Sequence, residues 1–245
     1  MSIERHREEL EHNRAALQRK PVLAAAYRDF HRLIAQQVAT GGATVELGSG
    51  GADIRAALPD CIRTDLFPGP GIDRVENAYA LSFGEAAIDN LILFDVFHHL
   101  RHPGTALAEF HRVLRPGGRL ILFEPCLSLL GWLVYGALHP EPVARLAPIA
   151  WRAPPGWSPA QVDYYAAQGN ATRIFLRGEF QDEFGGWAVR ERRRLSALAY
   201  VASGGYSAPQ LYPARLYPLL RLLERACDWL PAVFATRLLV VLERR

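Results

Sequence analysis

Residues 43–52 read ATVELGSGGA, an apolar run that ends at a glutamate and passes directly into a glycine-rich turn. A short apolar run is typical of a buried strand, and glycines after it let the backbone turn sharply and approach a ligand closely. The same alternation returns in AIDNLILFDVF (87–97) and RLILFEP (119–125). Continuous apolar runs predict strands that are covered on both faces, and therefore a parallel sheet.

The segments between these runs supply the other elements. Apolar residues at helical spacing predict helices over 22–38, from Pro103 onward, and through Leu216, Leu220, Leu223, Cys227 and Leu230. Shorter patterns predict a brief helix at 51–58, strands at 61–66 and 72–78, and a break at Pro116–Gly118. Towards the C-terminus they predict a helix at 173–183, an extended segment at 187–201 and a last strand at 237–245.

The length and rhythm of the chain predict one decorated domain over residues 1–245. N-terminal helices occupy 1–41, and the ligand-binding half of the sheet occupies 42–125. Residues 126–171 do not continue the alternation of strand and helix patterns and are rich in prolines and tryptophans, which indicates an inserted cap. The C-terminal half of the sheet follows at 172–245, with an added helix near 209–230.

Composition excludes several classes of protein. Half of the residues are hydrophobic and 22% are charged, so a disordered chain is excluded. The net charge of +3 gives an electrostatic field too weak to indicate nucleic-acid binding. The three cysteines lie far apart, form no CxxC motif and have no histidine-rich segment near them, so we expect no disulfide and no metal site. This cysteine usage predicts a reducing, cytoplasmic compartment. The longest apolar stretch, 126–138, is too short for a transmembrane span, and the charged N-terminus is unlike a signal peptide.

Polar residues close the predicted strands, at Glu46, Asp65, Asn77, Asp95 and Glu124. In an open parallel sheet the ligand binds beyond the carboxyl ends of the strands, so these side chains mark the expected site. A nicotinamide-binding turn would need glycine at position 53, where Asp53 stands, and a P-loop would need a lysine after the glycines. An acidic residue before the turn instead suits a ligand with a cationic amino or sulfonium group, and S-adenosylmethionine has both.

The chain resembles the class I S-adenosylmethionine-dependent methyltransferases through segments in the family's order: VELGSG (45–50), Asp65, ENAYALSF (76–83), LILFDVFHHL (91–100) and FHRVLRPGGRLILFEP (110–125). The resemblance implies a Rossmann-like α/β fold, with a seven-stranded, mainly parallel sheet, helices on both faces, an antiparallel last strand and a helical cap insertion. It also implies S-adenosylmethionine as cofactor and S-adenosylhomocysteine as product.

The resemblance further implies contacts for each part of the cofactor. The Gly turn faces the methionyl part, Asp65 the ribose, and Asn77–Ala78 the adenine, where the family has Asp-Ala. The asparagine keeps a hydrogen-bond acceptor but removes the charge, and Ala52 replaces the third motif glycine. The cofactor-binding residues predicted in this way are Glu46, Gly48, Ser49, Gly50, Asp65, Leu66, Asn77, Ala78 and Asp95.

Methyl transfer from a sulfonium depends mainly on alignment, but a hydroxyl acceptor also needs a base. Imidazole suits that role near neutral pH, and His98 follows the fourth strand by three residues. We therefore predict His98 as the catalytic base, with Glu124 and Tyr165 as further catalytic candidates.

The aromatic and leucine content of the cap suggests a small, largely apolar acceptor, of the kind met in specialised metabolism. The Asp/Asn-Pro-Pro-Tyr/Phe signature of enzymes that act on base amines is absent after strand four, so nucleic acid is not expected as acceptor. Two alternatives remain open: another sulfonium-assisted reaction, such as a cyclisation or elimination, and a non-catalytic cofactor-binding subunit. No pattern in the sequence indicates an oligomeric state.

Overall fold

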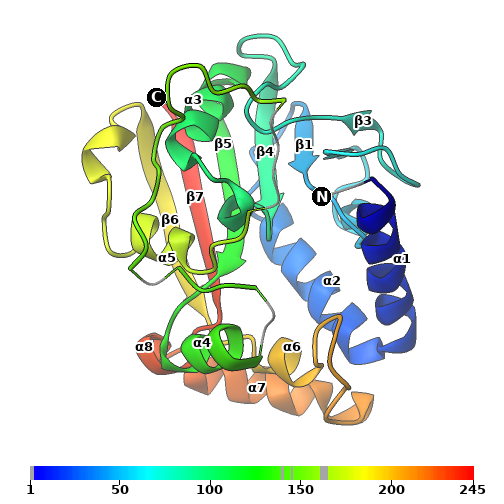
Figure 1. Ribbon diagram of the computed structural model, residues 1–245. Coiled ribbons are helices and arrows are strands. Elements are labelled where there is room, and N and C mark those ends of the chain that lie inside the picture. The colour runs from blue at the N-terminus through cyan, green and yellow to red at the C-terminus, as the bar shows by residue number, and fades with distance from the viewer. Residues whose placement is uncertain (1–2, 139–140, 145, 161–164) are drawn as a thin grey trace.

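The computed structural model describes residues 3–138, 141–144, 146–160 and 165–245. Within these residues a seven-stranded sheet forms the centre, in the order β3-β2-β1-β4-β5-β7-β6 (Figure 1). The strands are β1 (Thr44–Leu47), β2 (Ile62–Asp65), β3 (Arg74–Val75), β4 (Ile88–Phe94), β5 (Leu114–Pro125), β6 (Trp187–Leu195) and β7 (Arg237–Arg244). The predicted Rossmann-like α/β fold is confirmed.

Strand direction also follows the prediction. Strand β1 pairs in parallel with β2 and β4, and β4 pairs in parallel with β5. The last strand, β7, lies between β5 and β6 and is antiparallel to both, with Leu120 opposite Leu242 and Val240 opposite Arg192. The predicted antiparallel last strand is therefore confirmed.

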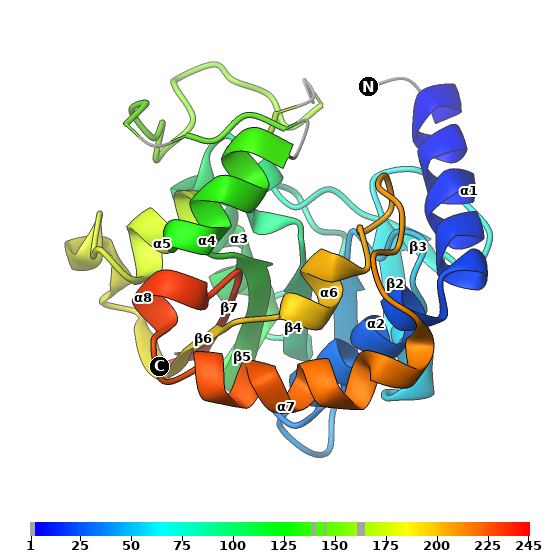
Figure 2. The same cartoon turned by 90° about the horizontal axis from the view of Figure 1, so that it is seen from below.

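Helices cover both faces of the sheet (Figures 1 and 2). They are α1 (Ile3–Arg19), α2 (Pro21–Ala35), α3 (Pro103–Val113), α4 (Leu129–Leu133), α5 (Asn170–Phe175), α6 (Leu198–Ala202), α7 (Tyr217–Cys227) and α8 (Pro231–Phe234). Strand β4 shows how the core divides, because successive side chains of a strand point to opposite faces. Leu91 and Leu93 join the core cluster that includes α3 and α5, whereas Ile92 and Phe94 join the one that includes α2.

Three predicted elements are shorter than expected, and the first is the strand predicted at 72–78, which is only β3 (Arg74–Val75). The helix predicted at 51–58 is only a 3₁₀ turn, η1 (Ile54–Ala56), which begins where the Asp53 carboxylate accepts a hydrogen bond from the Arg55 backbone N–H. Pro59 follows closely, and the residue before a proline disfavours helical backbone. The helix predicted at 173–183 is α5, which starts at residue 170 and ends at 175, followed by a separate turn, η4 (Gln181–Phe184).

Two predicted boundaries also differ. Strand β5 begins at Leu114 and runs through the predicted break at Pro116–Gly118, because a register shift and the left-handed backbone of Gly117 (φ +78°) accommodate these residues. The extended segment predicted at 187–201 ends at Leu195. The backbone of Ala197 is left-handed (φ +45°) and leads directly into α6.

The inward face of α7 is rotated from the predicted one, because Leu220 and Cys227 are half-buried as expected while the other leucines of the predicted stripe are exposed. Leu216 and Leu223, which were expected to pack inward, are exposed, and Glu224 is the buried residue of the helix. The Glu224 carboxylate accepts a hydrogen bond from the Ala199 backbone N–H at 2.6 Å and pairs with Arg221, so the polar side of α7 packs against α6.

Helices α4, α6, α7 and α8 gather beyond the carboxyl ends of β1, β4 and β5 (Figures 1 and 2). Among the described residues, no helix is both long enough and apolar enough to cross a bilayer. The carboxyl ends of the parallel strands thus face this layer of helices, with α1 at one side.

Candidate active site

Two cavities adjoin at the carboxyl ends of the strands. The Asp65 cavity, of about 290 Å³, is lined by the ends of β1 and β2 and by residues 76–79. The His98 cavity, of about 370 Å³, is lined by the end of β4, the cap and α6. Both are lined by Gly48, Gly50, Asp95 and His99, so these residues mark the boundary between them.

The glycine turn after β1 depends on backbone conformations that other residues rarely adopt. Gly48 and Gly50 have φ values of +64° and +56°. A Cβ atom at position 48 would also lie 2.5 Å from the Cγ2 atom of Val96. The backbone N–H of Ser49 donates to the Thr64 carbonyl at 2.9 Å, which ties the turn to β2. The turn thereby exposes its backbone to both cavities.

Glu46 is buried at the end of β1 and lines the His98 cavity. Burial raises the pKa of its carboxyl group to about 7, although a hydrogen bond with Ser49 and the nearby Arg63 guanidinium oppose the shift. The Arg63 Nε atom lies 3.5 Å from the Glu46 Oε2 atom. A cationic group in the cavity would favour the ionised carboxylate further.

Asp65 ends β2 and is buried at the edge of the Asp65 cavity. Its two carboxylate oxygens accept hydrogen bonds from the Gly50 N–H at 3.2 Å and the Leu66 N–H at 2.7 Å. These bonds fix the carboxylate between the glycine turn and the cavity. A carboxylate held at this position suits the diol of a ribose.

The predicted adenine-contacting pair lines the same cavity. Asn77 donates from Nδ2 to the Pro159 carbonyl at 2.8 Å, and its Oδ1 atom accepts from the Tyr79 N–H at 3.0 Å. The departure from the family's aspartate therefore has a structural use, because only an amide can donate to the cap. Leu66 and Ala78 supply apolar lining beside it.

Asp95 lies at the boundary of the cavities on left-handed backbone, with φ +56°. Its carboxylate pairs with the buried guanidinium of Arg237. Burial raises the pKa of Asp95 and Arg237 opposes the shift. The guanidinium in turn lies over aromatic rings, with its Cζ atom 4.4 Å from the ring centre of Tyr200 and 5.7 Å from that of Phe123. Arg237 carries the positive charge behind Asp95 and was missed by the sequence reasoning.

His98 is buried between two carboxylates. Its Nδ1 atom lies 2.7 Å from the Glu124 Oε2 atom, and its Nε2 atom lies 3.5 Å from the Glu141 Oε2 atom. Although burial alone would lower it, these carboxylates raise the pKa of His98 to about 10. His98 is therefore an imidazolium at neutral pH, which weakens the case for it as the base.

Glu124 holds the turn that carries the histidines. Its Oε1 atom accepts hydrogen bonds from the backbone N–H groups of Val96 and Phe97, at 2.9 and 2.7 Å. Glu124 is fully buried, and its Oε2 atom contacts His98. It does not line either cavity, and it holds His98 in place from behind.

His99 has the opposite electrostatic character. Its Nδ1 atom lies 2.8 Å from the Tyr165 carbonyl, which as an acceptor fixes the tautomer with the proton on Nδ1. Burial, followed by the charge of His98, lowers the pKa of His99 to about 4. Its Nε2 atom lies 3.7 Å from the Glu141 Oε1 atom. The boundary of the two cavities therefore holds a neutral imidazole backed by a carboxylate.

Glu141 bridges the two histidines from the cap. Although burial opposes the shift, the interaction with His98 lowers the pKa of Glu141, so this side chain is ionised. The nitrogen atoms of His98 and His99 and a Glu141 oxygen all lie within 4.8 Å of one another, a spacing at which a divalent cation could be held. The sequence analysis expected no metal site from the cysteine pattern, and no local signal links residue 141 to the histidine pair, which is distant along the chain.

Tyr165 lines the Asp65 cavity, and the Asn170 Nδ2 atom lies 3.5 Å from its hydroxyl. Within the described residues, the cap also lines the His98 cavity, through Tyr135, Glu141 and Gln168. Residues 139–140, 145 and 161–164 of the predicted cap lie outside the described residues. The cap tryptophans serve packing: for example, Trp151 stacks on Phe180 with ring centres 4.4 Å apart.

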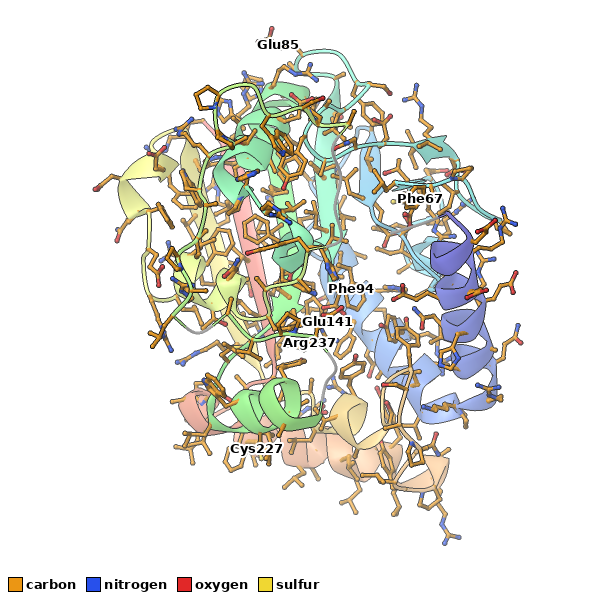
Figure 3. The ribbon with its side chains drawn as sticks, in the orientation of Figure 1. Phe67, Glu85, Phe94, Glu141, Cys227 and Arg237 are labelled. Atoms are coloured by element: carbon orange, nitrogen blue, oxygen red, sulfur yellow. The ribbon has the colours of Figure 1, made fainter. Side chains whose placement is uncertain are left out.

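Other lining residues come from elements that the sequence reasoning did not connect with the site. Glu9 and Asn13 of α1 line both cavities, and Tyr27 of α2 lines the His98 cavity with Tyr200 and Tyr206. Figure 3 places the labelled Phe94, Glu141 and Arg237 near one another, between the sheet and the helices α4 and α6. The helical spacing over 22–38 predicted a helix, but no local signal indicates that α1 and α2 cover a cavity.

Part of the chain is similar to a known protein family. Residues 46–122 match the family described as methyltransferase domain. This segment begins at Glu46 and includes the glycine turn, Asp65, Asp95 and the histidine pair. The matched segment and the strand order both support a methyltransferase domain that uses S-adenosylmethionine.

Similar proteins come from several organisms. Over 63 residues the chain is 38% identical to an uncharacterised 37.1 kDa protein in a transposon of Streptomyces fradiae, which covers 26% of this chain and 18% of that protein. The chain thus spans about a fifth of the length of that curated relative. Solved structures show the fold. A SAM-dependent methyltransferase of Thermotoga maritima has a TM-score of 0.56 at 12% identity, over 98% of this chain and 100% of that one.

A second solved structure is the geranyl diphosphate C-methyltransferase of Streptomyces coelicolor in complex with Mg²⁺, geranyl diphosphate and S-adenosylhomocysteine. It has a TM-score of 0.52 at 13% identity, over 91% of this chain and 79% of that one. At this level of identity the likeness concerns the fold.

Proposed function

We propose that the protein transfers the methyl group of S-adenosylmethionine to a small, largely apolar acceptor bound in the His98 cavity. The observation that supports this most directly is the contact between two chemically different cavities at Gly48, Asp95 and His99. One cavity has the residues expected for an adenosine, and the other has an aromatic lining with a titratable cluster. A group that passes between two ligands would cross this boundary.

The donor set of the Asp65 cavity fits the cofactor. Asp65 would hold the ribose hydroxyls, and Leu66 with Ala78 would pack against the adenine. Glu46 lies at the far side of the glycine turn, where a carboxylate would attract the amino group. S-adenosylmethionine supplies an electrophilic methyl group on a positively charged sulfur. The work left to the protein is mainly to orient the acceptor and exclude water.

The lining of the His98 cavity supports an acceptor with an apolar body and a polar, proton-bearing end. Tyr27, Tyr135 and Tyr200 present aromatic surface, which suits apolar groups. His98, His99 and Glu141 lie together at one side, where a hydroxyl or amine could be bound. Specificity would come from the cap and α6.

We assign the base role to His99, next to the residue that the sequence favoured. His99 is neutral at physiological pH, and its Nε2 atom could accept the acceptor's proton. Glu141, whose Oε1 atom lies 3.7 Å from the same Nε2 atom, would stabilise the resulting imidazolium through its negative charge. His98 would hold Glu141 in place. Tyr165 would position His99 through its backbone carbonyl, while Glu124 would position His98.

Two other functions remain distinguishable. A sulfonium-assisted cyclisation or elimination would use the same cofactor site, and a binding subunit would use it without turnover. Nucleic acid is a poor fit as acceptor because the net charge is only +3. The free thiols of Cys61, Cys126 and Cys227 agree with a reducing, cytoplasmic compartment, which is part of the proposal.

The decisive test is cofactor turnover on a panel of phenols, carboxylates, amines and lipids, with S-adenosylhomocysteine as the readout and mass spectrometry of the acceptor. We expect S-adenosylhomocysteine to form together with an acceptor that has gained one methyl group. Cofactor consumption without a methylated product would favour another sulfonium reaction. Cofactor binding without consumption across the panel would favour a binding subunit.

A further inference from the structure

Helix α7 and the residues after it present a row of large apolar side chains to solvent. We call this surface the α7 face and define it by Leu219, Leu222, Leu223, Trp229 and Leu230. The exposed fractions of these side chains are 59, 61, 53, 87 and 58%. Scattered exposed leucines are ordinary, but a contiguous apolar surface on one helix usually marks an interaction site.

The helix is amphipathic with its apolar side outward. Leu219, Leu222 and Leu223 recur at helical spacing within α7, as they would on a face that packs against a core. The side that packs against the protein is instead polar, because Glu224 is buried against the Ala199 N–H. The outward direction is therefore fixed by specific polar contacts.

Other exposed leucines lie at the same end of the molecule as α7. Leu129 and Leu133 of α4 are exposed by 70 and 57%, and α4 lies at the same end of the molecule as α7 (Figures 1 and 2). Leu211, in the connection before α7, is also exposed. Two separate elements thus carry exposed leucines at this end of the molecule.

The charges around the α7 face have one sign. Arg215 and Arg225 are exposed on this segment, whereas Arg221 is partly exposed and pairs with Asp29 and Glu224. Over residues 211–234, all of which the structure describes, the acidic residues are Glu224 and Asp228. Both are bonded inward, to Ala199 and Ser196 respectively. An outward surface of leucines, a tryptophan and arginines is complementary to anionic, amphipathic partners.

We propose that the α7 face binds the surface of a bilayer that contains anionic lipids. The leucines would enter the boundary between headgroups and acyl chains, and the arginines would contact lipid phosphates. Trp229 has the amphipathic ring that is favoured at this depth. A second copy of the chain fits less well, because a symmetric contact would bring the arginines of both copies together.

The orientation matters for the site. The His98 cavity is lined by Tyr135, which follows α4, and by Tyr200 of α6, and α6 packs on α7. Figure 3 shows the labelled Glu141 and Arg237 above this layer of helices. Docking through the α7 face would therefore bring the acceptor cavity near the lipid surface. The binding itself does not depend on the proposed methyl transfer.

The test is co-sedimentation of the full chain with vesicles of phosphatidylcholine alone and with added phosphatidylglycerol. We expect binding to the anionic vesicles that weakens with salt, and little binding to phosphatidylcholine. The charge reversal R215E/R225E and the polar exchange L222Q/L223Q should each weaken binding at least about tenfold. Free glycerol phosphate at matched phosphate concentration should not compete, because it lacks the apolar part.

Matched controls lie elsewhere on the surface. Arg245→Glu changes the charge at the opposite end of the sheet, and Leu146→Gln removes another exposed leucine, so neither should alter binding. Thermal melting of each variant checks that the exposed substitutions leave the fold intact. Absence of binding to anionic vesicles, or equal binding by wild type and L222Q/L223Q, would overturn the proposal. A dimer that L222Q/L223Q dissociates, without vesicle binding, would assign the face to a second copy.

Discussion

Asp65 is the residue through which the cofactor's ribose should be held. Its replacement by alanine removes a charged acceptor that the Gly50 and Leu66 amides orient toward the cavity. We expect Asp65→Ala to weaken S-adenosylmethionine binding by about 1.5 to 3 kcal/mol in calorimetry. Asp60→Ala, an exposed acid in the loop before β2, is the matched control and should bind normally. Unchanged affinity in Asp65→Ala would refute the assignment.

Glu46 gives cofactor binding a pH dependence. With a pKa of about 7 in the unliganded protein, this carboxyl group is largely protonated below neutral pH, whereas a cationic cofactor favours the ionised form. Affinity should therefore rise from about pH 5.5 to about pH 7.5, by at most about tenfold per unit below the pKa. The slope should disappear in Glu46→Gln. A wild-type affinity that is flat over this range would contradict the role of Glu46.

The same shift affects folding with the opposite sense. Because the pKa of Glu46 is raised in the folded state, the unfolded chain releases its proton at lower pH than the folded chain does. The contribution of Glu46 to stability is therefore present at low pH and is lost as the pH rises from about 4.5 toward 7.

His99 should dominate the chemical step. His99→Ala removes the neutral imidazole at the cavity boundary, so we expect kcat to fall by about 10² to 10⁴ while cofactor affinity stays nearly unchanged. His111→Ala, on the outer side of α3, should have wild-type kinetics and serves as the control. An intact kcat in His99→Ala would favour alignment alone or an acceptor that ionises without help.

At the scale of elements, the glycine turn after β1 is the most sensitive to substitution. Gly48→Val would combine an unfavourable positive φ with a clash against Val96. We expect a lower melting temperature and loss of cofactor binding. Gly84→Val is the control, because a Cβ atom there meets nothing within 4 Å. A folded Gly48→Val variant with normal affinity would show that the turn is misassigned.

Helix α1 should contribute to binding from outside the sheet. Glu9 lines both cavities, and its carboxylate would face a positively charged cofactor. We expect Glu9→Ala to weaken S-adenosylmethionine binding about threefold to tenfold by calorimetry. Glu8→Ala changes the neighbouring exposed acid and should have no effect. Equal affinity in Glu9→Ala and wild type would remove α1 from the cofactor site.

The elements that could be predicted from the sequence are those with local signals. Apolar runs ending in Glu46, Asp65 and Asp95 identify the strands and the edge of the sheet where ligands bind. A strand and the polar residue that closes it can be recognised because their signals lie in neighbouring residues. The orientation of α7 had no such signal. Its leucine spacing predicts a buried face, and only the contact between Glu224 and Ala199 shows that the polar side packs inward.

At the scale of the molecule, the titratable cluster could be predicted only in part. His98 and His99 follow β4 and were expected near the site, but Glu141 reaches them from the cap, more than 40 residues away. The pKa values of the two histidines then move in opposite directions because carboxylates flank one of them and burial dominates the other. No pattern within either segment encodes this arrangement.

The cap is also more deeply integrated than an insertion would suggest. Cys126, Trp151 and Ala171 are buried within the main core cluster. Exchange of residues 126–171 for a short linker, which the cap interpretation invites, would therefore expose the core as well as open the acceptor cavity. Single substitutions such as Gln168→Ala test the cavity with less damage to the fold.

The central claim is that S-adenosylmethionine bridges the two cavities, and a crystal structure of the protein with S-adenosylhomocysteine tests it most directly. We predict the ribose hydroxyls on the Asp65 carboxylate, the adenine beside Asn77 and Ala78, and the sulfur at the boundary formed by Gly48, Asp95 and His99. Electron density for the ligand elsewhere, or with its sulfur turned away from the His98 cavity, would contradict the account.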